Sequence, residues 1–304
     1  MSVAEAEARG VQGLDVSQGG LWSDAWHRLR RNRGAVIGFV LIGMFVFVAV
    51  FAPLIAPEDP RSGDLNRLAG SCCPGPSIDH WFGIDQQGRD ELSRIVYGAR
   101  YSLLIGVVSV TVGLSIGLVL GATAGYFGGV TDSVLMRLMD IMLSIPGLLL
   151  AIGIVAMLGP GIGQIMVAVG VTQIPIFARL MRGSVLATRE NDYVTAARSV
   201  GVKRRSILAS HILPNSISPV IVQATLALAT AIIDVAGLGF LGLGPQDPAT
   251  PEWGTMLTDT TRYLQTAPHL ALIPGIAIVI SVLGFNLVGD GLREALDPKF
   301  RGRG

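Results

Sequence analysis

Long apolar runs separated by shorter polar segments form the main pattern along this chain. A helix that crosses the hydrocarbon core of a bilayer needs about 20 mainly apolar residues. Six segments reach or approach that length, and none of them holds a charged residue. They are Ala35–Ile55, Tyr101–Tyr126, Ile141–Leu158, Ile162–Ala178, Ile217–Ile233 and Leu270–Val288. The pattern predicts an all-α integral membrane protein with six transmembrane helices.

Composition agrees with a membrane protein and gives no sign of a catalytic centre. Half of the residues are hydrophobic and 15% are charged. The histidines are far apart along the chain, so no metal-ligand spacing emerges; they are His27, His80, His211 and His269. The hydroxyl and acidic side chains form no recognisable catalytic arrangement, so we expect neither a metal site nor an enzyme. Three prolines within the predicted spans should bend or loosen them; these are Pro146, Pro175 and Pro274.

Basic residues predict the orientation in the membrane. Arginines crowd the start of the first span at positions 28–33, which places the N-terminus in the cytoplasm by the positive-inside rule. Six spans then place the C-terminus there too, together with a basic loop at 189–214. The loop before the second span carries mixed charge and falls outside. Residues 1–20 lack the apolar core of a signal peptide and are expected to form a tail.

These features divide the chain into four parts. We expect a cytoplasmic tail over 1–33 and a first helix with an extracytoplasmic loop over 34–99. A five-helix core over 100–293 includes the loop 189–214, and a cytoplasmic tail covers 294–304.

The segment Tyr193–Pro214 is polar and helix-prone although it lies between apolar spans. Several of its residues can share one face of a short helix; they are Tyr193, Val194, Ala196, Ala197 and Val200. Gly201 would end that helix, and Lys203, Arg204 and Arg205 follow in the turn. A second short helix would lead to Pro214 at the first position of the next span. The alternative is an ordinary cytoplasmic loop.

This segment resembles the coupling motif of ABC importer permeases. That motif reads Glu-Ala-Ala, three residues, Gly, nine residues, Ile, one residue, Leu-Pro. The matching positions are Ala196, Ala197, Gly201, Leu213 and Pro214, whereas Thr195 replaces the Glu and His211 replaces the Ile. The resemblance implies a cytoplasmic coupling helix that contacts a separate ATPase.

Other segments resemble the C-type permeases for dipeptides and oligopeptides. His80–Arg100 resembles their H-x-F-G-T-D-x-x-G-R-D segment, with Ile84 in place of Thr. Further likeness lies in RLMDIMLSIPGLLLAI from Arg137, in FLGLG at Phe240–Gly244 with PEWGTML at Pro251–Leu257, and in Asn286–Pro298. The resemblance implies the type I ABC importer permease fold and a peptide cargo. Nickel permeases share these motifs, so nickel or a nickel chelate is the alternative cargo; a multispan membrane enzyme or channel is the alternative class.

ATP hydrolysis is expected on another polypeptide. A phosphate-binding loop needs Gly-Lys followed by Ser or Thr. The only lysines are Lys203 and Lys299, which precede Arg204 and Phe300. The resemblance implies a prokaryotic plasma-membrane complex with a homologous second permease, two ABC ATPases holding ATP and Mg, and an extracytoplasmic substrate-binding protein. No cofactor on this chain and no nucleic-acid partner are expected.

A few polar residues remain open to two interpretations. Arg137 and Asp140 lie three apart on one helical face, so we expect a structural ion pair, with gating as the alternative. Asp234 near the outer end of the fifth span could bond to a partner chain or meet a substrate amine. Leu92, Ile95 and Val96 among charged neighbours suggest a helix along the outer surface.

Cys72 and Cys73 are the only cysteines and lie side by side in the outer loop. Because disulfide geometry disfavours so short a ring, we expect either a bond to a partner subunit or two separate thiols.

Overall fold

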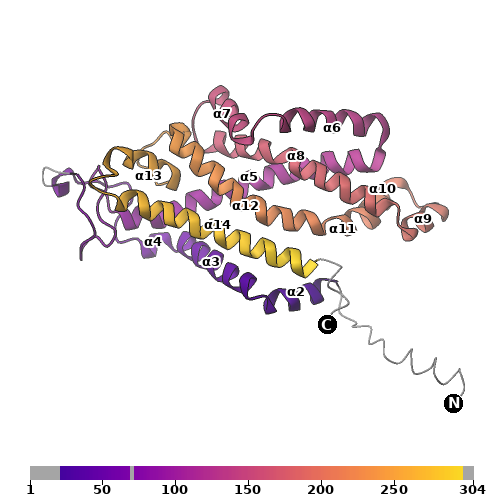
Figure 1. Cartoon of the computed structure of the whole chain (residues 1–304), viewed down its shortest axis with the longest axis horizontal. Coiled ribbons are helices and arrows are strands. Elements are labelled where there is room, and N and C mark those ends of the chain that lie inside the picture. Colours follow the sequence, from indigo (N-terminus) through magenta and orange to yellow (C-terminus); the bar gives the residue numbers. More distant parts are fainter. Residues whose placement is uncertain (1–20, 69–71, 297–304) are drawn as a thin grey trace, which may run out of the picture.

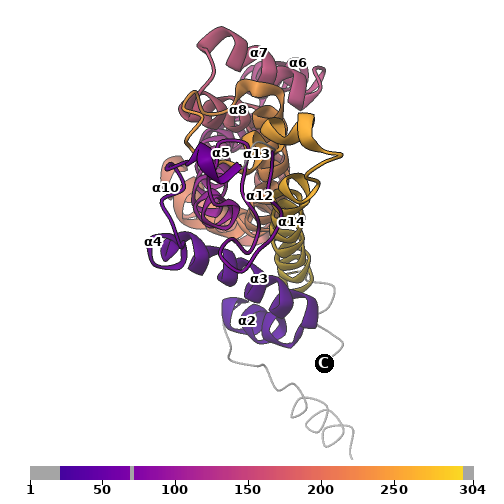
Figure 2. The same ribbon diagram turned by 90° about the vertical axis from the view of Figure 1, so that its left-hand side faces the viewer.

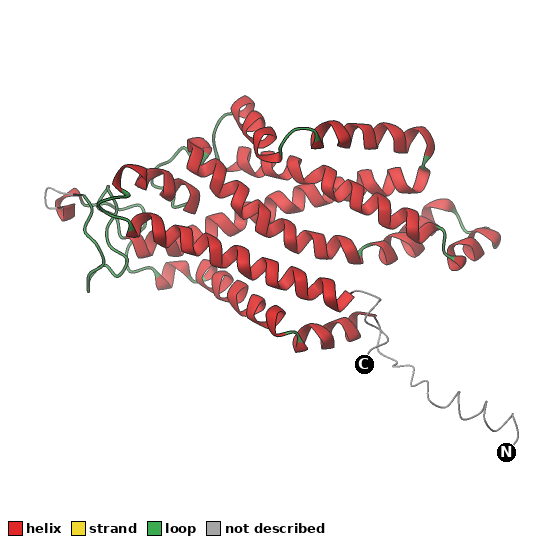
Figure 3. Cartoon of the chain, viewed as in Figure 1, coloured by secondary structure: helices red, strands yellow, loops and turns green. Residues whose placement is uncertain are grey.

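The computed structural model describes residues 21–68 and 72–296. In these ranges the regular elements are helices joined by loops (Figure 3). The long helices run side by side along the long axis of the molecule (Figure 1). Residues 1–20 and 297–304, which hold most of the two predicted tails, lie outside the described residues.

Five helices are long and apolar enough to cross a membrane, and a bent pair makes a sixth candidate span. The five are α3 (Arg33–Val50), α5 (Glu91–Phe127), α8 (Ile162–Arg189), α12 (Ser218–Leu238) and α14 (His269–Leu296). The bent pair is α6 (Gly129–Leu143) with α7 (Gly147–Leu158). Five of the six predicted spans are therefore present as long helices, and the third is present only if the bent pair counts as one span.

The break in the third span lies at Pro146. The axes of α6 and α7 differ by 90°. Proline has no backbone N–H to donate and disfavours helical geometry in the residue before it, so a helix tends to end there. The other two prolines behave differently, because α8 and α14 continue through Pro175 and Pro274.

The predicted surface helix before the second span is wrong. Residues from Glu91 onward form the first turns of α5 itself, and Arg94 and Val96 there are buried. Asp90 caps the helix, because its carboxylate accepts 2.8 Å hydrogen bonds from the backbone N–H and the hydroxyl of Ser93. Asp90 and Arg94, on either side of Leu92, form ion pairs within the protein, so this segment is an interior element.

Close packing of α5 against α8 organises the core. Four glycines at intervals of four face α8; they are Gly113, Gly117, Gly121 and Gly125. A Cβ placed on Gly117 would lie 2.6 Å from Phe177 Cβ and 2.9 Å from the Ile174 carbonyl oxygen. Small residues at this spacing let two helices approach closely within a membrane. The composition alone did not point to this interface, although the repeated G-x-x-x-G spacing is visible in the sequence.

The short elements gather at the two ends of the bundle (Figure 1). One end carries α2 (Leu21–Arg31), α9 (Asp192–Ser199), α10 (Arg204–Ile207), η2 (Leu208–Ile212) and α11 (Leu213–Ser216). The other end carries α4 (Ala52–Ile55), η1 (Leu65–Leu68), η3 (Gly239–Leu243), α13 (Trp253–Thr260) and η4 (Thr261–Tyr263). Viewed along the bundle, α6 and α7 lie on one side and α2 on the opposite side (Figure 2).

Candidate functional site

The segment from α9 to α11 forms the helix-turn-helix that the sequence predicts. Helix α9 stops in a Schellman arrangement, in which the amides of Gly201 and Val202 donate to the carbonyls of Arg198 and Ala197, both at 3.1 Å. Gly201 has a φ of +82°, in the left-handed region that glycine adopts at low cost. The sequence rule for a glycine stop therefore describes the local structure. We call Asp192–Ser216, from the start of α9 to the end of α11, the coupling segment.

The apolar residues of α9 do not share one environment. Val194 and Ala197 are buried against the main hydrophobic core. Tyr193, Ala196 and Val200 are exposed, Val200 by 79%. Thr195 is exposed as well. Helix α9 therefore uses one side to attach to the bundle and leaves a second, partly apolar side open at the end of the molecule.

Hydrogen bonds tie the coupling segment to the ends of two long helices. The hydroxyl of Tyr126, at the end of α5, donates to the carbonyl of Arg204 over 2.8 Å. The hydroxyl of Ser216 donates to Thr188 Oγ1 at the end of α8 over 3.0 Å, in a buried position. These three side chains escaped the sequence reasoning, because nothing in a local pattern marks a hydroxyl as a contact between distant segments.

The second half of the segment is anchored from inside. Ile207 and Ile212 are buried in the main core, whereas Lys203, Arg204 and Arg205 are exposed. Leu213 is partly buried against the same core. The second half of the coupling segment is thus held against the core by its apolar side chains and exposes its basic side chains.

Pro214 is not the first residue of the next span, as the sequence suggested. It lies in the first turn of α11, and α12 begins four residues later at Ser218. The turn before it, η2, is π-helical, with the amide of Leu213 donating to the carbonyl of Leu208. A proline has no N–H to continue the regular hydrogen-bond pattern of a helix, and π-helical geometry occurs mostly as single turns of this kind.

The predicted pair of Arg137 with Asp140 is wrong. Asp140 instead forms an ion pair with Arg179 of α8. One turn further along α8, Arg182 holds Asp132 of α6 through two hydrogen bonds of 2.7 and 2.6 Å. Arg137 is exposed and forms no ion pair with the described side chains. The sequence separation of three could not reveal a helix that approaches from elsewhere in the chain.

At the opposite end, the His80–Arg94 segment forms a buried charge network. Arg89 Nε donates to Asp85 Oδ2 over 2.6 Å, and Arg94 Nε lies 3.4 Å from the same oxygen. Arg89 also donates to the carbonyl of Pro248 over 2.8 Å. His80 Nδ1 lies 3.0 Å from Asp90 Oδ1. Pairing of these charges explains why the segment can carry so many of them without being a surface loop. Three buried atoms of the segment nevertheless have no hydrogen-bond partner among the described residues; they are Arg89 Nη2, Glu91 Oε1 and Arg94 Nη1.

Glu252 forms a second polar centre at that end. Its carboxylate caps α13 by accepting 2.9 Å hydrogen bonds from the amides of Gly254 and Thr255. Burial raises the pKa of Glu252, because a desolvated carboxylate is disfavoured, and these amide hydrogen bonds oppose the effect. The next residue, Trp253, is fully buried over Gly98 of α5 and donates from Nε1 to the carbonyl of Ile95 over 3.2 Å.

Comparison with known proteins decides the family. Residues 117–302 match the family described as binding-protein-dependent transport system inner membrane component. Residues 20–69 match the N-terminal TM domain of oligopeptide transport permease C. The chain belongs to the binding-protein-dependent permease family. It is a multi-pass membrane subunit of an ABC importer that works with a second permease and ATPase partners, and it is not itself an enzyme.

The similarity of the permease to named relatives covers nearly its whole length. It is 48% identical over 281 residues to the dipeptide transport system permease protein DppC of Alkalihalophilus pseudofirmus, which covers 92% of this chain and 90% of that protein. It is 45% identical over 282 residues to the glutathione transport system permease protein GsiD of Escherichia coli, covering 92% and 91% of the two chains.

Solved structures confirm the predicted fold. A chain of the MetNI methionine ABC transporter, described in inward-facing conformations, matches the permease with a TM-score of 0.56 and 21% sequence identity. The match covers 66% of this chain and 96% of that one. This is the type I ABC importer permease fold.

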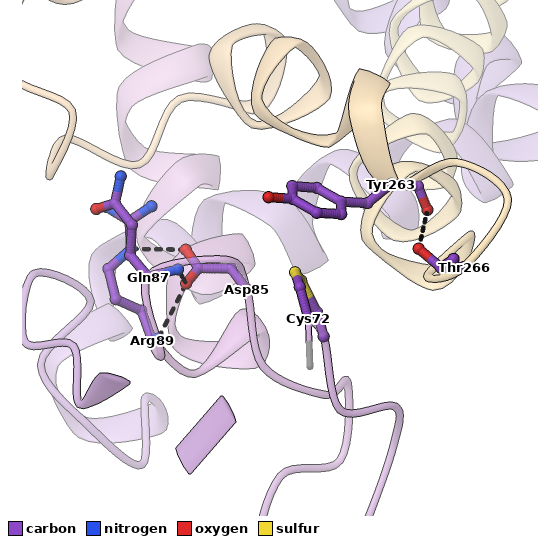
Figure 4. The surroundings of a disulfide bond; sticks show 7 residues. Cys72, Asp85, Gln87, Arg89, Tyr263 and Thr266 are labelled. Carbon is purple, nitrogen blue, oxygen red and sulfur yellow. Dashed lines mark hydrogen bonds and ion pairs between the residues drawn. A yellow bond between two sulfur atoms is a disulfide. The ribbon is translucent and has the colours of Figure 1, made fainter. Parts of the chain in front are cut away.

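The two cysteines of the permease lie against each other. In the structure Cys72 and Cys73 are paired with one another; the sequence led us to expect a bond to a partner subunit or two separate thiols, and that expectation stays a prediction. Both pack in a small cluster with Ala267, Leu270 and Tyr263, and the ring of Tyr263 lies beside Cys72 (Figure 4). Cys73 is buried in this cluster and Cys72 is partly buried.

Two further sequence predictions have more limited outcomes. Asp234 is half-buried on α12 and forms no hydrogen bond with the described residues, so its role stays a prediction. Among the described residues, no cluster of three or more His, Cys, Asp or Glu side chains could hold a metal ion.

Proposed function

We propose that this permease imports short peptides. The observation that carries the proposal is the near-full-length identity of 48% and 45% to permeases named for dipeptide and glutathione transport. Glutathione is itself a small peptide, so both names agree on the class of cargo. This agreement favours peptides over the nickel alternative that the motifs left open. This chain and the homologous second permease would each form half of the translocation pathway.

In this proposal, a separate extracytoplasmic binding protein delivers the peptide and the ATPases hold ATP and Mg. The coupling segment is the contact with one ATPase. Its open side combines apolar Tyr193, Ala196 and Val200 with the basic turn 203–205, all exposed. Exposed apolar side chains at a loop end are typical of a binding surface. The hydrogen bonds from Tyr126 and Ser216 would pass ATPase movement to α5 and α8 as a rigid-body displacement.

The same proposal places both termini in the cytoplasm. Arginines of α2 and α3 lie at the end of the bundle that also carries the coupling segment (Figure 1). A concentration of basic residues on one side is the usual mark of the cytoplasmic face. In this orientation, Arg137, Asp140 and Asp234 would lie in or beside the translocation pathway, or against the second permease.

The test is uptake in cells that differ only in this chain. Labelled dipeptide and labelled nickel are supplied to cells with and without the gene, and the chain is restored from a plasmid as the control. Loss of peptide uptake alone supports the proposal. Loss of nickel uptake alone keeps the importer and overturns the cargo, and unchanged uptake of both rejects a peptide or nickel role.

A further inference from the structure

The short helix α2 meets α3 in an elbow that is held in place on one side only. Ala25 and Leu29 of α2 are buried with Ala35 and Ala295. Asn32, between the two helices, accepts a 3.0 Å hydrogen bond from the amide of Ala35 and donates a 2.5 Å bond to Glu294 of α14. The elbow angle is therefore fixed by α14, and the opposite side of α2 and α3 is left open.

A groove of about 410 Å³ lies on the open side of the elbow. Its lining consists of Trp26, Leu29 and Arg30 from α2 with Val36, Phe39 and Val40 from α3. The three α3 residues are 43%, 42% and 65% exposed, respectively. Because α3 is a candidate span, these side chains lie where acyl chains cover the protein. The groove therefore runs from a polar edge into the hydrocarbon region.

Positive charge surrounds the polar edge of the groove. The guanidinium carbon of Arg30 lies 4.6 Å from the centre of the Trp26 ring, which is a cation–π contact at a side chain that prefers the membrane interface. Arg31 and Arg33 are exposed nearby. None of these arginines forms an ion pair with the side chains that the structure describes.

We propose that this elbow is a binding site for one anionic phospholipid. The phosphate and headgroup would contact Arg30 and Arg33, and an acyl chain would lie along Val36, Phe39 and Val40. Arginine suits this role because its guanidinium matches phosphate oxygens in two-point hydrogen bonds. Basic clusters directly beside a span attract anionic lipid, and the attraction decreases within a Debye length. A zwitterionic lipid would leave the positive charge uncompensated.

The proposal needs this end of the bundle to lie at a membrane surface, which follows from the permease family and not from the cargo. Failure of the peptide assignment would leave it intact. The lipid would fix α2 against the membrane and so support the base of α14, which packs on both α2 and α3.

Native mass spectrometry of the purified complex can test the site. The complex, isolated with its co-expressed partner subunits, is mixed with phosphatidylglycerol or phosphatidylcholine, and the apparent affinity of each bound lipid is measured. We expect at least one site that prefers phosphatidylglycerol. In the double variant Arg30→Gln and Arg33→Gln, that affinity should fall about thirty-fold, as the loss of two surface arginines implies. Excess inorganic phosphate should not displace the lipid, because the acyl chain holds it.

Matched variants separate the site from general charge effects. Arg61→Gln with Arg262→Gln removes two exposed arginines at the opposite end of the bundle and should leave the affinity unchanged. Trp26→Ala should weaken the site while all arginines remain, and Trp26→Phe should restore most of the binding. Equal affinity for both lipids, an unaltered double variant, or displacement by phosphate alone would each overturn the proposal.

Discussion

The hydroxyl of Tyr126 at the end of α5 donates a 2.8 Å hydrogen bond to the carbonyl of Arg204 in the coupling segment. The two residues are 78 positions apart, and the bond joins a transmembrane helix directly to the surface proposed to contact the ATPase. Together with the buried Ser216–Thr188 contact, it makes the coupling segment part of the bundle rather than a free loop.

We expect Tyr126→Phe to weaken the transmission of movement without releasing the ATPase. The change removes one hydrogen bond, with a net value of about 0.5–1.5 kcal/mol, and keeps the aromatic ring. Peptide uptake per hydrolysed ATP should decrease, as measured in proteoliposomes with the complete complex. Tyr263→Phe is the control, because the Tyr263 hydroxyl forms no hydrogen bond with the described residues. Equal peptide uptake per hydrolysed ATP in both variants would show that the Tyr126 hydrogen bond does not transmit movement of the ATPase.

The two alanines of the coupling motif should respond differently to substitution. Ala196 is exposed, whereas Ala197 is buried against the core. Ala196→Glu should abolish co-purification of the ATPase while the permease stays folded, because the added charge meets the partner surface. Ala197→Glu should instead lower the yield of folded permease, since it buries an unpaired carboxylate.

Ala196→Ser serves as the control for the docking surface and should retain the ATPase. Co-purification and the thermal midpoint of the permease are measured for all three variants. A folded Ala196→Glu permease that still binds ATPase at full stoichiometry would place the docking surface elsewhere.

Packing of α5 on α8 should tolerate no side chain at Gly117. A Cβ there would lie 2.6 Å from Phe177 Cβ, so Gly117→Ala requires one helix to move. We expect a loss of about 1–3 kcal/mol in the free energy of unfolding, seen as a lower thermal midpoint of the purified complex. Gly43→Ala in α3 is the control, because a Cβ on Gly43 meets no atom within 4 Å. A thermal midpoint that Gly117→Ala leaves unchanged would refute the close contact.

Glu252 should make folding stability depend on pH. Its pKa is raised by burial, so the folded state holds a proton that the unfolded state has lost once the pH exceeds the ordinary Glu value of about 4.3. The contribution of Glu252 to the free energy of unfolding is therefore fully present at lower pH and decreases as the pH rises toward the raised pKa. The slope is at most about 1.4 kcal/mol per pH unit.

Glu252→Gln should remove that dependence. Near pH 5 the variant should be slightly less stable than the wild type, because an amide caps α13 less well than a carboxyl group. The difference should shrink or reverse by pH 8. Thermal midpoints over this range measure the effect, and Asp79→Asn, which alters an exposed acid, provides the reference. Parallel pH profiles for wild type and Glu252→Gln would contradict the assignment.

Local patterns were sufficient for the spans, the coupling segment and the family. Apolar length alone predicts where the chain crosses the bilayer, because unpaired backbone groups cannot remain there outside a helix. Gly201 and the turn after α9 follow from local backbone preference, which acts over a few residues. The coupling motif was specific enough to identify the permease family only together with the other matching segments, which include His80–Arg100, Phe240–Gly244 and Asn286–Pro298.

Only the tertiary structure decided which distant groups meet. Asp140 pairs with Arg179 rather than Arg137, residues 91–96 are interior rather than on the surface, and Ala196 and Ala197 face opposite environments. Each of these depends on a helix that approaches from another part of the chain. Local sequence determines helical propensity and apolar length over short distances, whereas ion pairs and buried faces depend on how helices far apart in sequence pack together.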